Sequence, residues 1–363
     1  MKEQIKRIIK YYIAERNLQG RYNEGNKDLQ KGLAQSVQIS KEQEKDILEF
    51  WMPYLNTKLA KKTFDIRWFN IYNRTNVFDF DLKYYIPDGY YYCIVDPLFS
   101  NMKEAPVLDD KNLYDLYLSG APLPKTICRK NDDVYLDTDY QIIPIEKAIN
   151  LCADQGKVIM KSTVNSMAGS GLKYWDKDKS SIDDLRNLLL GKGSVVVQEV
   201  INQHEVLASF CNSCVNTLRL VTLLFDGVVN VVQSVVIMGG KDAKTNHLHS
   251  GGIVCGILPS GQLRHTGFDG KLNMYKTHPN GIVFSDVTIP NYDQCVSLVK
   301  ELAPRFSRVS RLIGWDLTID SKGQPLIIEP NLYYGGSVQI AAGPVFGDLT
   351  KEVLDFVNKG TKM

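Results

Sequence analysis

The segment from Gly314 to Asn331 constrains this chain most, because it places two carboxylates and a carboxamide in an otherwise apolar β-hairpin. With a four-residue loop over 321–324, Asp316 lies opposite Glu329, with Cβ atoms about 5 Å apart on one face. The period of two along a strand returns Asn331 to the same face. Two buried carboxylates this close repel each other, so the pattern calls for a compensating cation.

Ligands that offer only oxygen suit Mg²⁺ or Mn²⁺, which typically bind one or two carboxylates together with nucleotide phosphates. The same loop length pairs Thr318 with Ile327. The alternative is a solvated hairpin whose acids point outward, in which case Leu317 and Ile319 face the core instead. We expect the metal site.

Basic residues elsewhere could complete a nucleotide site. Lys161 ends an expected strand over 158–162 and precedes the glycine loop 168–171, whose backbone N–H groups could approach phosphates. A lysine at a strand end is also common without a ligand, and the spacing is not that of a P-loop. Arg219 falls in the apolar run 215–225, and a buried arginine needs an anion, either a transferring phosphate or one of the protein's own acids. We expect the phosphate, because the hairpin of Arg219 itself offers few acids.

The second half of the chain alternates clear strand and helix patterns. Asp226-Gly227 is a two-residue hairpin signal between two long apolar runs. The strand ending near Glu199 could present its backbone to an adenine or could be a plain strand. We expect strands over 158–162, 195–200, 218–225, 228–238, 312–319 and 325–328, and helices over 144–151, 181–191 and 293–304.

The first half is less regular. Ser40 and Gln43 form a capping box that predicts a helix start. Residues 2–16 have helical spacing, and we expect a surface helix packed on the body rather than a membrane- or partner-binding helix, because the segment is short and has no aromatic anchor beyond its tyrosines. We expect a loop over 17–39, short strands within 64–97 and a helix over 109–118.

Composition narrows the class of protein. The net charge of +2 gives no field of the kind expected of a dedicated nucleic-acid binder. Seven scattered cysteines indicate reduced thiols in a cytoplasmic protein, and the lone pair Cys211 and Cys214 lacks the second pair that a zinc site needs. No apolar run is long enough to span a bilayer.

Taken in order, these motifs resemble the ATP-grasp superfamily and, more narrowly, the sugar-transfer-associated ATP-grasp family, relatives of α-L-glutamate ligases. The resemblance covers roughly residues 70–355. Its motifs are Asp110-Lys111-Asn112, Lys161 with the glycine loop, Gln198-Glu199-Val200, Asn216-Thr217-Leu218-Arg219, Ser250-Gly251-Gly252, Gly314-Trp315-Asp316 and Glu329-Pro330-Asn331.

The resemblance implies an α+β, ATP-grasp fold in which two α+β lobes clasp ATP behind an N-terminal helical extension. The implied division is an extension over 1–65, an N-terminal region over 66–125, a small lid subdomain over 126–205 and a large C-terminal subdomain with the metal site over 206–363.

The resemblance also implies roles for individual residues. Arg219 and Lys161 would be catalytic, and Asp316, Glu329 and Asn331 would bind Mg²⁺ or Mn²⁺. The ATP-binding set would be Lys111 and Lys161 at the phosphates, Gly169 and Gly171 in the loop, Gln198, Glu199 and Val200 at the adenine, and Glu205 at the ribose. The substrate set would be Asn246, Gly251, Gly252, Gly335, Gly336 and Ser337. Gln198 stands where many relatives have glutamate, and His247 and His249 receive no role.

The implied activity is a carboxylate–amine ligation that proceeds through an acyl-phosphate and uses ATP. The substrates would be a small-molecule carboxylate, such as a sugar acid or amino acid, and an amine, both used in assembling a surface polysaccharide such as a capsule. One alternative is an ATP-grasp kinase that phosphorylates a small-molecule or sugar hydroxyl. Another is a nucleotide-binding module without enzymatic activity.

Overall fold

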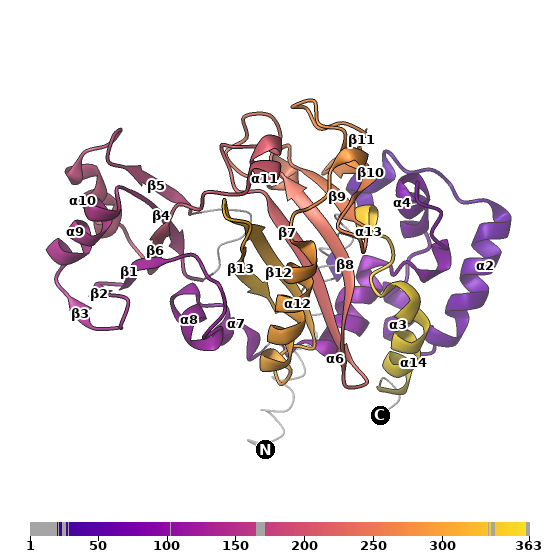
Figure 1. Ribbon diagram of the computed structural model, residues 1–363. Helices are drawn as coiled ribbons and strands as arrows, with labels where there is room; N and C mark the ends of the chain where they lie inside the picture. The colour runs from indigo at the N-terminus through magenta and orange to yellow at the C-terminus, as the bar shows by residue number, and fades with distance from the viewer. Residues whose placement is uncertain are drawn as a thin grey trace, which may run out of the picture.

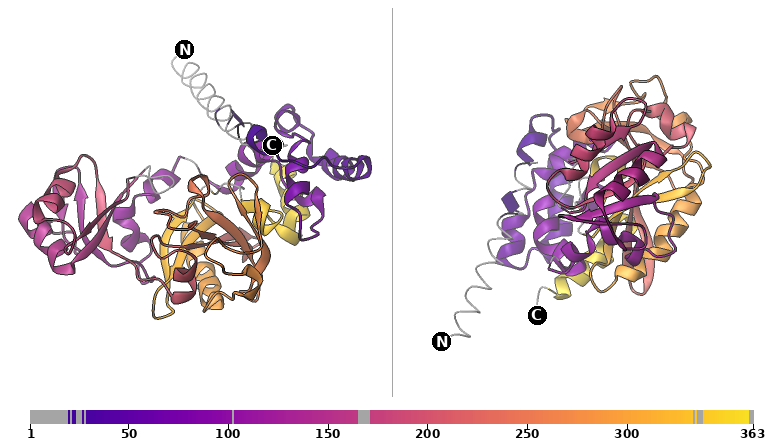
Figure 2. Two further views of the ribbon diagram at one scale, coloured as in Figure 1. Left: turned by 90° about the horizontal axis from the view of Figure 1, so that it is seen from above. Right: turned by 90° about the vertical axis from the view of Figure 1, so that its left-hand side faces the viewer.

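The computed structural model describes residues 20, 22–23, 27, 29–101, 103–164, 171–332, 334 and 338–360. Within them, two antiparallel sheets lie next to each other, and a layer of N-terminal helices packs beside the larger sheet (Figures 1 and 2). The α+β class is confirmed. The helix expected over 2–16 lies outside the described residues.

The N-terminal layer is helical. Ser40 accepts a hydrogen bond from the Gln43 backbone and receives the reciprocal bond, so the predicted capping box is confirmed at the start of α2 (Lys41–Trp51). Further helices are α3 (Lys58–Thr63), α4 (Trp68–Thr75), α5 (Asp88–Tyr90), the π-helix Tyr91–Val95, α6 (Asp96–Phe99), α7 (Ala105–Leu108) and α8 (Tyr114–Tyr117), with 3₁₀ turns at Met52–Tyr54, Leu82–Tyr84 and Lys111–Leu113.

Two expectations for this layer were wrong. Residues 64–97 form helices rather than short strands, and residues 29–33 are helical where a loop was expected. The aromatic residues that suggested strands, such as Phe69 and Tyr91, are fully buried between helices and the larger sheet. Leu29 is fully buried as well. Tertiary burial therefore outweighed the strand preference of aromatic side chains.

The smaller sheet has its own core. Its strand order is β3 (Ile142–Ile143), β2 (Val134–Leu136), β1 (Thr126–Asn131), β6 (Val195–Glu199), β4 (Lys157–Ser162) and β5 (Lys173–Asp176). Helices α9 (Ile145–Gln155) and α10 (Ile182–Leu190) pack against it. Ser181 caps α10 with a capping box and Gly191 ends it, as predicted.

The larger sheet runs β11 (Met274–Tyr275), β10 (Leu263–Asp269), β9 (Ile253–Ile257), β8 (Val228–Met238), β7 (Thr217–Phe225), β12 (Leu312–Ile319) and β13 (Pro325–Asn331). Asp226 and Gly227 have φ of 48° and 75°, which fits the predicted tight hairpin turn between β7 and β8. Its remaining helices are α11 (Glu205–Phe210), α12 (Tyr292–Leu302), α13 (Gln339–Ala342) and α14 (Thr350–Gly360), with 3₁₀ turns at Leu248–Ser250, Phe284–Asp286, Ala303–Phe306 and Gly347–Leu349.

This sheet is buried on both faces. Leu220 joins the cluster that contains α12, whereas its neighbour Val221 joins the cluster formed with the N-terminal helices and α14. Figures 1 and 2 show the same arrangement, with α12 in front of the sheet and the N-terminal helices behind it and to its right. Both faces of the sheet are therefore covered by helices. No helix in the described parts of the chain is long and apolar enough to cross a bilayer.

The register of the β12–β13 hairpin is correct at one end and wrong at the other. Asp316 pairs with Glu329 as predicted, but Thr318 pairs with Leu326 rather than Ile327. A β-bulge next to Asp316 accounts for the difference, because one extra residue of β13 is accommodated there. Both carboxylates therefore keep the opposed positions that the metal hypothesis required.

Candidate functional site

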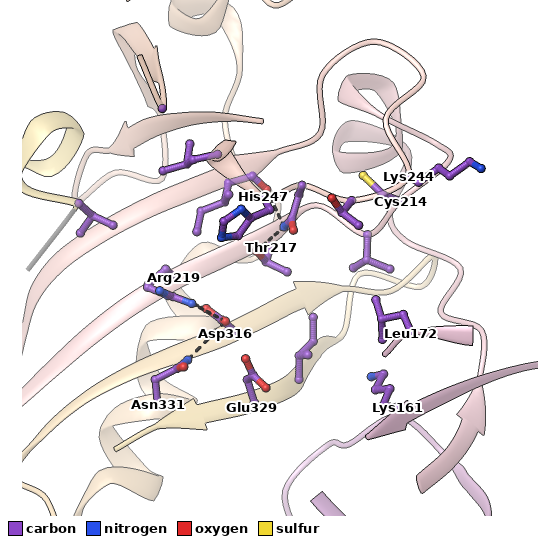
Figure 3. Close-up of a pocket in the computed structure, with 18 of the residues that line it drawn as sticks. Lys161, Leu172, Cys214, Thr217, Arg219, Lys244, His247, Asp316, Glu329 and Asn331 are labelled. Carbon is purple, nitrogen blue, oxygen red and sulfur yellow. Dashed lines mark hydrogen bonds and ion pairs between the residues drawn. The ribbon is translucent and has the colours of Figure 1, made fainter. Parts of the chain in front are cut away.

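A cavity of about 1250 Å³ lies where the two sheets approach each other (Figure 3). Ile159, Lys161 and Tyr174 line it from the smaller sheet. Arg219 on β7 and the carboxylates of the β12–β13 hairpin line it from the larger sheet. The fold thus brings together basic and acidic residues that are far apart in sequence, such as Lys161 and Glu329, which are separated by 168 positions.

Arg219 and Asp316 form a bidentate ion pair. They lie directly opposite each other on β7 and β12. Arg219 Nε donates to Asp316 Oδ1 over 2.7 Å and Nη2 donates to Oδ2 over 2.6 Å. Burial raises the pKa of Asp316, and the Arg219 guanidinium opposes that shift. Of the two anionic partners considered for Arg219, the structure shows the acid.

Asn331 completes this side of the site. Its Nδ2 donates to the Gly314 carbonyl over 3.0 Å and approaches Asp316 Oδ2 at 3.4 Å. These bonds hold the amide beside the carboxylate, on the face that strand periodicity predicted. Asp316, Glu329 and Asn331 all line the cavity.

Two lysines approach Glu329 from the other side. Lys111 Nζ lies 2.9 Å from Glu329 Oε2, with the two side chains 9% and 25% exposed. The Lys111 backbone N–H donates to the Thr163 carbonyl over 3.0 Å, which ties this lysine to the end of β4. Burial lowers the pKa of Lys161 to about 8, Glu329 raises it and Lys111 lowers it further. Asp109 also lines the cavity, and burial raises the pKa of its carboxyl.

The donor set fits a hard divalent cation together with a polyphosphate. Asp316 and Glu329 oppose each other across the hairpin, and Asn331 adds an amide. Among the described residues, no three His, Cys, Asp or Glu side chains are grouped so that they could hold a metal alone. Mg²⁺ usually takes one or two carboxylates and completes its shell with phosphate oxygens and water, so the set suits a nucleotide-bound ion.

Of the residues predicted to contact the adenine and the ribose, some line the cavity and others do not. β6 ends at Glu199, and Val200 lines the cavity together with the three residues that follow it. Gln198 Nε2 instead points to the Pro124 carbonyl at 3.5 Å, and Glu199 Oε1 accepts from the Lys125 backbone over 3.1 Å. Glu205 is the exposed first residue of α11 and is not among the described residues that line the cavity.

The glycine positions have different surroundings. Gly171 has φ of +81°, and a Cβ there would lie 2.6 Å from Ser162 Oγ. Gly251 also has a positive φ, of +86°, and a Cβ on Gly252 would overlap the Asn246 carbonyl oxygen. Gly251 and Gly252 therefore support the loop rather than line the cavity. The predicted positions Gly169, Gly335, Gly336 and Ser337 lie outside the described residues.

Asn246 does line the cavity. Its Nδ2 donates to Thr217 Oγ1 over 2.8 Å and to the Ile237 carbonyl over 3.2 Å. His247 lines the cavity as well, near Thr217 (Figure 3). Thr217 belongs to the same sequence motif as Arg219 and stands two residues before it on the same strand face, but the sequence assigned it no role.

Cys211 and Cys214 lie close to this loop. Their sulfur atoms are 3.3 Å apart, and Cys214 lines the cavity. Burial raises the pKa of Cys214 to about 12. All seven cysteines are free thiols.

Sequence reasoning missed the end of the cavity that the N-terminal helices line. Lys31 and Trp68 line it from the N-terminal helices, and Lys271 lines it from the turn after β10. No motif marked these positions, because they come from segments that are distant in sequence and had no recognised pattern. Only the packing of the helices against the larger sheet reveals them.

Known proteins place the chain in a family. The family described as sugar-transfer associated ATP-grasp matches residues 96–354. No protein with a curated description matches.

Solved structures resemble the chain at low identity. The ATP-grasp ligase PsnB complexed with minimal precursor is 15% identical over 71% of this chain and 63% of its own, with a TM-score of 0.37. D-alanyl-alanine synthetase A from Vibrio cholerae is 13% identical over 69% and 62%, with a TM-score of 0.40. The biotin carboxylase domain of Hydrogenobacter thermophilus 2-oxoglutarate carboxylase is 14% identical over 72% and 47%, with a TM-score of 0.44. The chain spans less than two thirds of each.

The family match agrees with the resemblance drawn from the motifs and covers more than half of the chain. It includes both sheets, the hairpin with Asp316 and Glu329, and the two lysines that face it. The chain belongs to the sugar-transfer associated ATP-grasp family.

Proposed function

We propose that this protein is an ATP-dependent carboxylate–amine ligase. The observation that carries the proposal is the convergence of Arg219, Lys111 and Lys161 on the opposed carboxylates Asp316 and Glu329 at one cavity. Cationic and acidic groups arranged in this way suit a metal-bound polyphosphate whose terminal phosphoryl group is transferred.

In this proposal the nucleotide lies between the two sheets. Lys161 and Lys111 bind phosphate oxygens, because both line the cavity and Lys111 Nζ lies 2.9 Å from Glu329 Oε2. The segment 200–203 lies against the adenine, since it follows the end of β6 and lines the cavity. Asp316, Glu329 and Asn331 hold Mg²⁺, which offsets charge on the transferring phosphoryl group when it is bound.

Arg219 has two tasks in this arrangement. Its bidentate bond to Asp316 holds that carboxylate in one orientation, which fixes a metal ligand. The ion pair uses Nε and one hydrogen of Nη2, so the guanidinium keeps further N–H donors for a phosphoryl oxygen. A carboxylate attacks the γ-phosphorus, ADP leaves, and an amine then displaces phosphate from the acyl carbon.

The wider context rests on the family description. A sugar-transfer association favours a sugar acid as the carboxylate and surface-polysaccharide assembly as the setting. We assign 126–205 as the small lid subdomain and 206–363 as the large subdomain, because each range contains one sheet. A cytoplasmic location is supported by seven unpaired cysteines.

The test is a product analysis of the purified full-length chain with Mg·ATP, a panel of sugar acids and an amine donor. We expect ADP, phosphate and an amide by mass spectrometry. A phosphoester without an amide would identify a kinase instead. Glu329→Gln should abolish turnover, whereas Asp293→Asn, an exposed acid in α12, should leave it unchanged. Turnover that survives Glu329→Gln would refute the site.

A further inference from the structure

One end of the cavity is formed by N-terminal helices that precede the family match. Trp68 and Lys31 line it, yet both precede residue 96, where the family match begins. The whole cavity, at about 1250 Å³, also exceeds the range of about 300–1000 Å³ that is typical for one small ligand. A second ligand therefore has room beside a nucleotide.

This end of the cavity is a rigid wall. Gln339, at the start of α13, donates through Nε2 to the Ile86 carbonyl over 2.9 Å and to Tyr72 Oη over 3.2 Å. Its Oε1 accepts from the Ile86 backbone over 3.1 Å. These bonds join Tyr72 of α4 and the backbone of Ile86 to α13, which follows the β12–β13 hairpin in the sequence. The wall is thus fixed against α13, which itself contacts β8 and β9 of the larger sheet.

Trp68 on this wall has an indole N–H without a partner among the described residues. The other three tryptophans each donate from Nε1, to the Lys83 carbonyl, the Ser181 carbonyl and Thr222 Oγ1, over 2.8 to 2.9 Å. The Trp68 ring stacks on Tyr72 with centroids 5.8 Å apart and stays 6% exposed. The indole N–H is not among the fully buried polar atoms of the described residues that lack a partner, so it is open to the cavity, where a ligand oxygen would accept its hydrogen bond.

Two lysines line this end of the cavity. Lys31 and Lys271 are both exposed and line the same cavity, and Asp88 is the acid on the adjoining wall. The backbone N–H of Lys271 donates to Asp269 Oδ1 over 2.8 Å, which fixes the turn that carries it. An anionic group at this end would meet the ammonium groups of Lys31 and Lys271, whereas the Asp269 carboxylate is already engaged by the Lys271 and Asn273 backbone N–H groups and by Tyr275.

We propose that the N-terminal wall is the acceptor subsite and that it takes a sugar acid carrying a second anionic group such as a phosphate. The carboxylate faces Arg219, a sugar oxygen accepts from the Trp68 indole, and the second anion lies near Lys31 and Lys271. The proposal rests on the proposed ligase function, because the carboxylate has to reach the transferring phosphoryl group.

The test is calorimetric binding to the full-length chain without ATP, with D-glucuronic acid 1-phosphate, D-glucuronic acid and inorganic phosphate as probes. The 1-phosphate should bind at least about tenfold more tightly than glucuronic acid, since charge-assisted bonds are the strong ones. Lys271→Gln should remove most of that difference. Trp68→Phe should weaken both sugar acids about three- to tenfold, the usual worth of one hydrogen bond. Lys58→Gln, an exposed lysine outside the cavity, is the matched control.

Equal binding of the two sugar acids would overturn the proposal, as would no binding of either. Wild-type affinity in both Lys271→Gln and Trp68→Phe would overturn it too. Lys271 is exposed, so its variant tests the idea even if Trp68→Phe lowers stability. Failure of the ligase function has a different signature, namely intact binding of the 1-phosphate with no ATP consumption when an amine is added.

Discussion

Replacing Asp316 by alanine should destabilise the protein far more than removing the charge of Glu329, although both acids are proposed metal ligands. Asp316→Ala leaves the Arg219 guanidinium in the sheet interior without its bidentate partner. Removing one member of a buried ion pair costs about 3–5 kcal/mol, because the other charge stays desolvated. Glu329 is 25% exposed and makes one contact with Lys111 at 2.9 Å, so Glu329→Gln should cost about 1 kcal/mol or less.

These free energies convert into melting temperatures. An unfolding entropy of about 2.1 cal/mol/K per residue gives about 0.76 kcal/mol/K for 363 residues. Asp316→Ala should therefore lower Tm by about 4–7 °C, and Glu329→Gln by about 1 °C, in differential scanning calorimetry without nucleotide. Both variants should lose Mg-dependent ATP turnover.

A double variant separates the stability effect from the site. Arg219→Met with Asp316→Leu replaces the pair by apolar groups and should recover most of the lost Tm while staying inactive. A Tm for Asp316→Ala within about 1 °C of the wild type would refute the reasoning, because the desolvated charge would then cost nothing.

Three further outcomes are expected. The kcat/KM for ATP should fall as the pH rises through about 8, because burial lowers the pKa of Lys161 to about 8 and the side chain loses its charge above that pH. Lys161→Arg should remove this pH dependence, and a dependence that persists in the variant would contradict the role of Lys161. EDTA should abolish ATP turnover and Mg²⁺ or Mn²⁺ restore it, with Asn331→Ala requiring more metal in an activity titration; an unshifted titration would remove Asn331 from the ligand set. Gly252→Ala should lower Tm, because its Cβ would overlap the Asn246 carbonyl oxygen, and an unchanged melting curve would show that the loop can move.

The local features of this chain follow from its sequence. Ser40 and Ser181 cap helices because a hydroxyl three residues before an amide or acid satisfies the first N–H groups without outside help. Asp226 and Gly227 tolerate positive φ, which sets a tight turn between two long strands. Asp316 and Glu329 face each other because pairing across a short hairpin depends only on loop length and strand period.

Features that depend on distant segments required the tertiary structure. The bulge beside Asp316 shifted the register toward the loop, since an extra residue can be accommodated at many places along a strand. Residues 64–97 became helices because the aromatic side chains found burial against the larger sheet. The partner of Arg219, the exposed position of Glu205 and the wall that carries Trp68 likewise depend on which surfaces pack together. Helix-capping hydrogen bonds and turn geometry involve only a few neighbouring residues, so they can be predicted from the sequence. Burial depends on which distant segments pack together, so it requires the tertiary structure.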